Sequence, residues 1–507
     1  MRKRALMIKQ EYGGIGMMKR LLSMLLAALL LLTAVPAPAE EVWVPGEAPA
    51  IRQTLAEEEV VAERNAILAK GELLYSGKVN RGYNAGPNIA WLKEAAPEDV
   101  LALVWACDDV THGGWGVLGL SISGKQMEIM AVSDHPEKER LNVYTIAELM
   151  AFAGVETPAD FKGFVLGAWN GGRVAGLYLL KGEAAQELAA HAAKVKEAEQ
   201  VIHTYKGELS NENAIPEAKT LYEYLKATWQ TGCLTGQMES TWMGSPDYEM
   251  LYLQNNTGKL PAIRGLDFMH NDFRGVAKRA EEWWEKGGIP HICWHTGSDF
   301  ASGYNESKDH NLNWETALTP GTEDYAKLLK AMDRAVPYLQ QLEDAGVPVL
   351  WRPFHELDGG WFWWSKGGSE SFVKLWQLMY SRYTDYWGLD NLIWLLGYSG
   401  NGGNMAAWYP GDDYVDLIGA DSYTAGANGN LYREVAALAP EGMPIVFHEC
   451  GTVPTEAQMT EAAAPWLMFM VWHTDWLTDA NNNTKEALKE IYNSEYFITL
   501  DELPAFK

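Results

Sequence analysis

Short apolar runs alternate with amphipathic segments from about Pro216 to the end of the chain. The amphipathic segments carry apolar residues three or four positions apart, as at Phe372, Trp376 and Met379, which is the spacing of one buried helix face. Continuous apolar runs are typical of parallel strands that are covered on both faces. Eight such runs cover residues 233–237, 262–268, 291–295, 347–356, 391–398, 415–423, 444–449 and 466–473. The pattern predicts an α/β fold in which residues 216–507 form a (β/α)8 barrel.

The pattern before the barrel is different. Between residues 83 and 182, runs such as VLALVWA and VAGLYLL are separated by Gly, Asn and Asp, which predicts a small antiparallel β domain. We expect an acidic segment over residues 40–82, helical from 51 to 74, before this domain and a helical connector over residues 183–215 after it. Trp115 and Trp169 could stack on a sugar ring, although a place in the domain core is the simpler interpretation.

The N-terminal stretch predicts a targeting segment. Met18, Lys19 and Arg20 lead into LLSMLLAALLLLTAV and then into Ala37-Pro38-Ala39, the order of a basic region, an apolar region and a small-residue cleavage site. The apolar run is short for a membrane span, so a permanent anchor is the weaker alternative. We therefore expect residues 1–39 to be a cleaved signal peptide, and the mature protein to be secreted without a membrane span.

Composition narrows the class of partner. The 22 tryptophans of this 507-residue chain supply flat apolar surface, which suits a carbohydrate binder as well as a core. The formal net charge of −26 argues against nucleic acids and anionic membranes, which both attract basic patches. We expect a monomer that acts on an uncharged substrate.

No CxxC motif occurs, so a zinc or redox site is not expected, and we interpret all four cysteines as buried thiols: Cys107, Cys233, Cys293 and Cys450.

Polar and aromatic residues close most of the predicted strands. In a (β/α)8 barrel the carboxyl ends of the strands form the face that carries chemistry. Buried polar groups cost free energy, so packing alone explains poorly why so many stand at strand ends. These residues are Gln237, Glu239, Asp267, His295, His355, Glu356, Asp421, Tyr423, His448, Glu449, Trp472 and His473.

Two of these residues, Glu356 and Glu449, follow the fourth and seventh strands and would meet across the rim. Retaining glycosidases need two carboxyls about 5–5.5 Å apart. The tryptophans after Glu356 offer an apolar wall of the kind that suits an acid, and Arg352 or Tyr423 could keep Glu449 ionised. The alternatives are a structural ion pair between Arg352 and Glu356 and a buried structural carboxylate at Glu449. The pairing of the two glutamates favours catalysis.

Other kinds of chemistry find little support. His355 and Glu356 are not followed by a histidine at the zincin spacing, where Gly359 stands instead. The pair Asp412-Asp413 precedes a strand, and we interpret it as a solvated turn. The nucleophile-elbow pattern G-x-S-x-G is absent near the strand ends. We expect neither a metal nor a cofactor.

The sequence resembles glycoside hydrolase family 26, the β-mannanase family, over roughly residues 215–506. The resemblance is carried by WRPFHELDGGWFWW, by ICWH ending at His295, by YPGDDYVDLIGADSY and by HECG around Glu449. It implies a (β/α)8 barrel and a retaining endo-acting hydrolase, with Glu356 as acid/base and Glu449 as nucleophile. It also implies supporting roles: Tyr423 bonds the nucleophile, Arg352 and Asp421 brace the site, His295, His355 and Trp361 line the subsites, and Trp472 stacks on the sugar.

The motifs depart from the family pattern at a few positions. Leu357 and Asp358 stand where Met-Asn is common, SKGG follows WFWW, and His473 stands where some members carry Arg. These departures affect specificity and leave the expected chemistry intact. We expect an endo-β-1,4-mannanase acting on mannan, glucomannan or galactomannan. A β-1,3-1,4-glucanase or a β-1,3-xylanase is the alternative within the family, and a non-catalytic carbohydrate-binding protein is the alternative outside it.

Overall fold

The computed structural model describes residues 42–506, apart from residues 54, 78–82, 85–88, 108–114, 133–138, 170–171 and 401–403. The expected signal peptide, residues 1–39, lies outside the described residues. Within the described part of the chain, no helix combines the length and apolarity needed to cross a membrane.

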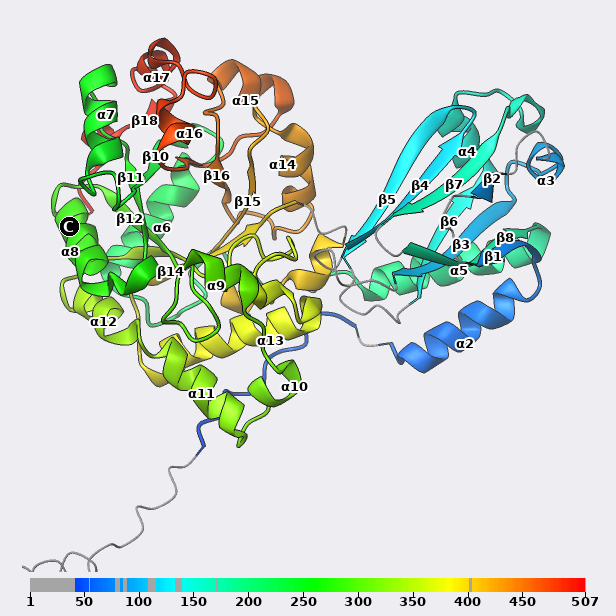
Figure 1. Cartoon of the computed structure of the whole chain (residues 1–507), viewed down its shortest axis with the longest axis horizontal. Helices are drawn as coiled ribbons and strands as arrows, with labels where there is room; N and C mark the ends of the chain where they lie inside the picture. Colours follow the sequence, from blue (N-terminus) through cyan, green and yellow to red (C-terminus); the bar gives the residue numbers. More distant parts are fainter. Residues whose placement is uncertain are drawn as a thin grey trace, which may run out of the picture. The chain divides into compact units, whose positions relative to one another are not determined.

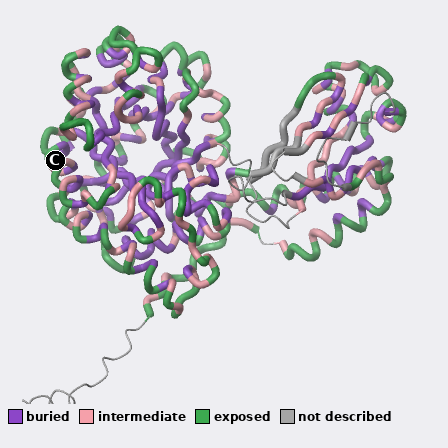
Figure 2. The backbone as a smooth tube through the Cα atoms, viewed as in Figure 1, coloured by how far each residue is buried: buried purple, intermediate pink, exposed green. Residues whose placement is uncertain are grey.

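The C-terminal region is a closed ring of eight parallel strands, which confirms the predicted barrel (Figure 1). Every residue in most of these strands is buried, and Figure 2 shows the buried segments running through the ring. This burial explains why the strands read as continuous apolar runs. The strands are β10 (Gly236–Met238), β11 (Ile263–Asp267), β12 (Ile289–Cys293), β13 (Val349–Arg352), β14 (Leu392–Tyr398), β15 (Leu417–Ser422), β16 (Ile445–Cys450) and β17 (Phe469–Val471).

Helices surround the ring on its outside (Figure 1). The spacing of Phe372, Leu375, Trp376 and Met379 places them all on the buried face of one helix, α13, as the sequence pattern predicts. The helices are α6 (Pro216–Thr228), α7 (Tyr248–Thr257), α8 (Phe273–Glu285), α9 (Tyr304–Asp309), α10 (Trp314–Ala317), α11 (Glu323–Met332), α12 (Val336–Asp344), α13 (Gly368–Ser381), α14 (Gly429–Ala436), α15 (Glu456–Ala462), α16 (Asp475–Thr478) and α17 (Lys485–Ile491).

Most predicted barrel strands have different limits in the structure, and two of these differences change the path of the chain. The run 233–237 is divided, because β9 (Cys233–Leu234) pairs with β18 (Phe497–Ile498) outside the ring and only β10 enters it. The run 347–356 stops being a strand at Arg352. Phe354 and Glu356 both have positive φ, 49° and 51°, so the chain leaves the extended conformation before it reaches the glutamate.

The region before the barrel contains two antiparallel four-stranded sheets, which confirms the predicted β domain. Leu101, Trp105, Leu120 and Phe164 belong to a core shared by the two sheets. The sheet orders are β1-β8-β3-β6 and β2-β7-β4-β5. Their strands are β1 (Glu72–Gly77), β2 (Tyr83–Asn84), β3 (Val100–Cys107), β4 (Trp115–Ile122), β5 (Lys125–Val132), β6 (Arg140–Thr145), β7 (Phe164–Trp169) and β8 (Gly172–Leu180), with α3 (Ala90–Lys93) and α4 (Ile146–Ala153) beside them.

The helix expected over residues 51–74 is wrong in its limits. The structure has α2 (Glu57–Leu68) followed by β1, which pairs with β8, so the sheets begin before residue 83. The helix of the expected connector, α5 (Gly182–Ala198), contacts α2, and both pack on one face of the first sheet. Trp115 and Trp169 lie on the adjacent strands β4 and β7, and their side chains fall outside the described part of the structure.

The interpretation of Asp412-Asp413 as a solvated turn is wrong for the first residue. The Asp412 side chain is fully buried and accepts four hydrogen bonds, whereas Asp413 is exposed. The donors to Asp412 are the His203 ring at 3.0 Å, the Tyr409 hydroxyl at 2.8 Å and the backbone amides of residues 204 and 205 at 2.5 and 2.8 Å. Asp412 therefore fastens the segment after α5 to the barrel.

Asp412→Ala is expected to lower the free energy of unfolding by about 3 kcal/mol at pH 7, because two buried amides lose their acceptor. Burial raises the pKa of Asp412, but the bonds from His203, Tyr409 and the amides outweigh burial and lower the pKa below its ordinary value. This contribution is therefore present above the ordinary carboxyl pKa and is lost as the pH falls through the lowered pKa. Urea unfolding at pH 7 and pH 3, followed by tryptophan fluorescence, measures both effects.

Asp413→Ala is the matched control, because that side chain is exposed and accepts a single 3.2 Å bond from Thr204. It should change the free energy of unfolding by less than about 0.5 kcal/mol. Equal losses for the two substitutions at pH 7 would contradict the role given to Asp412.

Candidate active site

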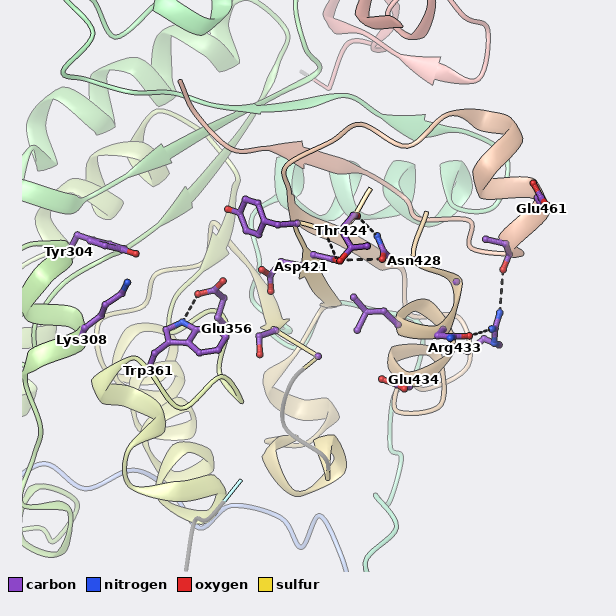
Figure 3. A pocket seen from close by; sticks show the side chains of 18 residues that line it. Tyr304, Lys308, Glu356, Trp361, Asp421, Thr424, Asn428, Arg433, Glu434 and Glu461 are labelled. Atoms are coloured by element: carbon purple, nitrogen blue, oxygen red, sulfur yellow. Dashed lines mark hydrogen bonds between the residues drawn. The ribbon is translucent and has the colours of Figure 1, made fainter. Parts of the chain in front are cut away.

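Three carboxyl groups meet at the carboxyl end of the barrel. One oxygen from each of Glu356, Asp421 and Glu449 lies within 4.8 Å of the other two. They come from the turn after β13, from β15 and from the end of β16. Figure 3 shows Glu356 beside Asp421 near the middle of the cleft. The two glutamates that the sequence places on opposite strands therefore come within reach of one sugar carbon.

Glu356 lies in a turn that is held from several sides. Its own φ of 51° and that of Phe354 are left-handed values, which a glutamate rarely adopts. The Trp361 ring nitrogen donates to the Glu356 carboxylate at 2.8 Å, and the Leu357 amide donates to the Gly397 carbonyl at 3.2 Å. The turn thereby aims a half-buried carboxyl at the cleft.

The glycine pair of the motif has a structural reason. A Cβ atom at Gly359 would lie 2.4 Å from the ring of Trp361, a distance that real contacts do not show. Only glycine therefore lets the indole fold back and reach Glu356. Trp364 also fixes this loop, because its ring nitrogen donates to the His355 carbonyl at 2.9 Å.

Glu449 is buried and has two side-chain donors. Arg352 donates to one carboxylate oxygen at 3.1 Å, and the Tyr423 hydroxyl donates to the other. Burial raises the pKa of Glu449, as does the neighbouring Glu356, whereas Arg352 and Tyr423 act in the opposite direction. Both donors, Arg352 and Tyr423, were expected beside Glu449 from the sequence, and both lie there in the structure.

Asp421 is buried between the two glutamates. Burial, followed by the charges of Glu356 and Glu449, raises the pKa of Asp421 well above its ordinary value. A hydrogen bond with Glu356 adds to this shift. The raised pKa favours the protonated form of Asp421 and so limits the negative charge that the three carboxyls carry together.

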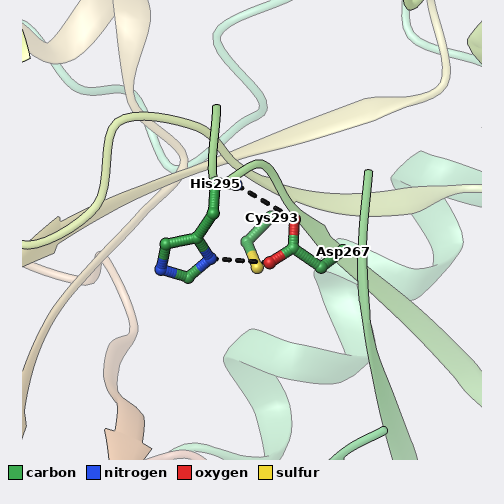
Figure 4. Close-up of side chains that lie close together, drawn as sticks. All are labelled: Asp267, Cys293 and His295. Carbon is green, nitrogen blue, oxygen red and sulfur yellow. Dashed lines mark hydrogen bonds and ion pairs between the residues drawn. The ribbon is translucent and has the colours of Figure 1, made fainter. Parts of the chain in front are cut away.

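Two histidines form a chain that begins at Asp267, and Figure 4 shows its first contact, between Asp267 and His295. Nδ1 of His295 lies 2.6 Å from the Asp267 carboxylate, so it carries the hydrogen and leaves Nε2 free to accept. Nε2 of His355 lies 3.0 Å from that atom and donates to it. Burial lowers the pKa of His355 well below its ordinary value, so its ring is neutral. The chain fixes both rings beside the carboxyls.

Cys293 lies next to this chain, and its sulfur, the Asp267 carboxylate and the His295 ring are close enough to suggest a metal site. The donor set suits a metal poorly. Burial raises the pKa of the Cys293 thiol well above its ordinary value, so the thiolate that metals prefer is disfavoured. Nδ1 of His295 is also already committed to Asp267 at 2.6 Å.

The trio of Glu356, Asp421 and Glu449 is a second set of potential metal ligands. The raised pKa of Asp421 favours its protonated form over the carboxylate that a metal would bind. Glu449 already faces the guanidinium of Arg352 at 3.1 Å. A cation would have to displace a proton and compete with a fixed positive charge, so this arrangement favours acid–base and nucleophilic chemistry.

Aromatic side chains extend the site toward β17. The Trp472 ring lies 5.6 Å from the His295 ring and 4.7 Å from the His473 ring. Trp242, which the sequence analysis did not single out, is 49% exposed and meets His473 edge-on at 4.6 Å. Its position after β10 is the signal that could have found it, because a tryptophan in a rim loop has no core to fill.

A cleft of about 1060 Å³ is lined by two of the three carboxyls, Glu356 and Asp421, and by Tyr423, which donates to the third. Glu356, Asp421 and Tyr423 line its centre, and Figure 3 shows Tyr304 and Lys308 on one side of them. On the other side, Figure 3 shows residues from α14, α15 and the loop before α14, none of which carries a sequence motif: Asn428, Arg433, Glu434 and Glu461.

Comparisons with known proteins agree with this geometry. A mannan endo-1,4-beta-mannosidase of Thermothelomyces thermophilus is 32% identical over 329 residues, which are 60% of this chain and 65% of that protein. The GH26-CBM35 β-(1,4)-mannanase of Podospora anserina superposes with a TM-score of 0.54 at 26% identity, covering 80% of this chain and 88% of the other.

A further structural match is a β-mannanase from a symbiotic protist of the termite Reticulitermes speratus, complexed with gluco-manno-oligosaccharide. It superposes with a TM-score of 0.54 at 31% identity, covering 60% of this chain and 99% of the other. This chain spans 51–65% of the length of the first curated relatives that it matches. A model of Glycosyl hydrolase family 26 matches residues 210–502, which is more than half of the 507 residues, and the chain belongs to that family.

Proposed function

We propose that this protein is a retaining endo-β-1,4-mannanase. The observation that carries the proposal is the approach of the Glu356 and Glu449 carboxylates to within 4.8 Å at the carboxyl end of the barrel. A retaining enzyme needs both carboxyls to act on one anomeric carbon, and a wider spacing would leave room for a water molecule between Glu449 and the sugar.

In the first step the Glu449 carboxylate attacks the anomeric carbon. Glu356 gives its proton to the glycosidic oxygen, and the bond between that oxygen and the anomeric carbon breaks. The products are a glycosyl ester on Glu449 and a released chain with a new hydroxyl. Arg352 lies 3.1 Å from the Glu449 carboxylate, so its positive charge faces the attacking group during this step.

In the second step the ionised Glu356 takes a proton from water. The water oxygen attacks the anomeric carbon, the ester bond to Glu449 breaks, and the sugar leaves with its original configuration. The Tyr423 hydroxyl and Arg352 then receive the carboxylate that Glu449 becomes. Each residue ends in the state in which it began.

The choice of mannan rests on the relatives, which are named for mannan or mannose-containing substrates. We expect the purified protein to release reducing ends from mannan, glucomannan or galactomannan at least about tenfold faster than from lichenan or β-1,3-xylan. A fall in viscosity ahead of reducing-end release would identify endo action. Faster release of reducing ends from lichenan or from β-1,3-xylan would instead identify the protein as a glucanase or a xylanase. Binding without release would indicate a non-catalytic protein.

We also propose that residues 1–39 direct the protein to the secretory route and are removed. Support comes from the order of basic, apolar and small residues and from a polymeric substrate that a cell meets outside its membrane.

A further inference from the structure

His448, the residue before Glu449, has an imidazole whose two nitrogens have different partners. Nε2 lies 3.0 Å from the backbone carbonyl of Tyr398, and Nδ1 lies 2.9 Å from a terminal nitrogen of Arg352. A carbonyl can only accept and a guanidinium can only donate. Nε2 therefore carries the hydrogen, and Nδ1 is a bare acceptor for Arg352. The ring is fully buried, so no solvent competes for either bond.

Arg352 joins His448 to the carboxylate. One terminal nitrogen of its guanidinium donates to His448 and the other donates to Glu449 at 3.1 Å. The Arg352 side chain is 0% exposed, and its Nε has no hydrogen-bond partner among the described residues. Two consecutive residues of β16 thus provide the bonds that orient this buried cation.

Gly397 of β14 provides the room for the imidazole. A Cβ atom at this position would lie 2.7 Å from Nε2 of His448 and 3.0–3.1 Å from two of its ring carbons. A glycine inside a strand often marks such a close approach. The same glycine accepts a bond from the Leu357 amide, next to Glu356. Gly397 thus contacts both the His448 ring, which precedes Glu449, and the turn that carries Glu356.

The charge state agrees with this hydrogen-bond pattern. Burial, followed by the charge of Arg352, lowers the pKa of His448 well below its ordinary value. This shift favours the neutral ring, in agreement with a bare acceptor nitrogen that faces Arg352 at 2.9 Å.

We propose that His448 is a positioning residue for the nucleophile: its neutral ring holds the Arg352 guanidinium against Glu449, and through Arg352 it orients that carboxylate and keeps it ionised. The inference rests on the proposed function of Glu449. Removing the acceptor frees Arg352 to turn away, so that Glu449 both attacks more slowly and becomes easier to protonate. The other groups near Glu449 stay unchanged: Glu356, Asp421, Tyr423 and His295.

Two substitutions of His448 test the roles of its two ring nitrogens separately. The amide oxygen of His448→Asn occupies roughly the place of Nδ1 and can still accept from Arg352, whereas His448→Gln places its amide near Nε2 and keeps only the bond to Tyr398. We expect His448→Gln to slow the attack by Glu449 about 10- to 100-fold, which is the effect of a lost hydrogen bond to a charged group. His448→Asn should stay within a few-fold of the native rate.

The attack is measured with a 2-deoxy-2-fluoro-β-mannobiosyl fluoride, whose leaving group does not need the proton of Glu356. Mass spectrometry of the intact protein gives the rate of labelling. His448→Gln should lower the maximal labelling rate with little change in the concentration for half-saturation, and should move the acidic limb of its pH profile upward. Gly397→Ala, which displaces the ring without removing it, should act in the same direction.

Phe447→Leu is the control for a general disturbance of β16. Its ring stacks on Trp466 at 5.0 Å. As the strand neighbour of His448, Phe447 points to the opposite face of β16, so the substitution should lower the melting temperature and leave the labelling rate unchanged. Native labelling rates and pH limbs in His448→Gln and Gly397→Ala would overturn the positioning role alone. Absence of labelling in the native protein, together with absence of reducing ends, would overturn the proposed function itself. If His448→Gln does not fold, Gly397→Ala and His448→Asn decide the question.

Discussion

Glu449→Ala is expected to lower kcat on mannan by about 10⁴-fold or more, because no other group can form the covalent intermediate. Azide should restore part of the activity on an activated aryl mannobioside, because the small anion fits the space of the missing carboxylate. Since it attacks from the side of Glu449, the product should be the α-mannobiosyl azide, with inverted configuration. Nuclear magnetic resonance of the product identifies the anomer.

Glu441→Ala, an exposed glutamate before β16, is the matched control and should retain native activity. Thermal unfolding should accompany the assay, because removal of Glu449 leaves the buried Arg352 without its counter-charge. Glu449→Gln keeps the shape of the side chain and should be equally inactive without azide rescue. A Glu449→Ala protein that hydrolyses mannan at the native rate would remove Glu449 from the mechanism.

Glu356→Ala is expected to reduce kcat on mannan by about 10² to 10⁴-fold, the usual value of a general acid and base. The loss should be smaller on a dinitrophenyl mannobioside, whose leaving group needs no proton, and the glycosyl ester on Glu449 should then accumulate. Azide should attack that ester from the side of Glu356 and yield the β-mannobiosyl azide, with retained configuration.

The exposed Glu370 at the start of α13 serves as control for this substitution, since Glu370→Ala removes a carboxylate of the same chemistry outside the turn. The two azide products distinguish the roles of the two glutamates without reference to rates. If Glu356→Ala gave the α-azide, or lost the same factor on both substrates, Glu356 would not be the acid.

The barrel and the pairing of Glu356 with Glu449 at its rim were predictable for a definite reason. Parallel strands that are covered on both faces appear in the sequence as long apolar runs. A carboxyl at the end of such a run costs free energy to bury, so packing alone does not explain its presence. Glu356 and Glu449 therefore stand out in the sequence even though 93 positions separate them. The structure adds that Glu356 lies beyond its strand, in a left-handed turn that no apolar pattern indicates.

The parts that were missed depend on contacts between distant segments. Asp412 looks like any acidic turn residue until the amides of residues 204 and 205 are seen to bond it. The β1 strand follows an acidic helix, and only its pairing with β8 defines it. His448 stands out as a polar strand end, but its tautomer is set by Tyr398, 50 positions earlier in the sequence. Local sequence patterns do not carry such information.

The left-handed backbone at Glu356 places a carboxyl in the site at a cost to the stability of this loop. A side chain in that conformation costs about 1–2 kcal/mol that glycine would not. Laboratory evolution for heat resistance alone would therefore tend to replace Glu356 by glycine, and heat-tolerant clones that lack this carboxyl would accumulate. Every round of selection for a hardier enzyme needs an activity screen beside it.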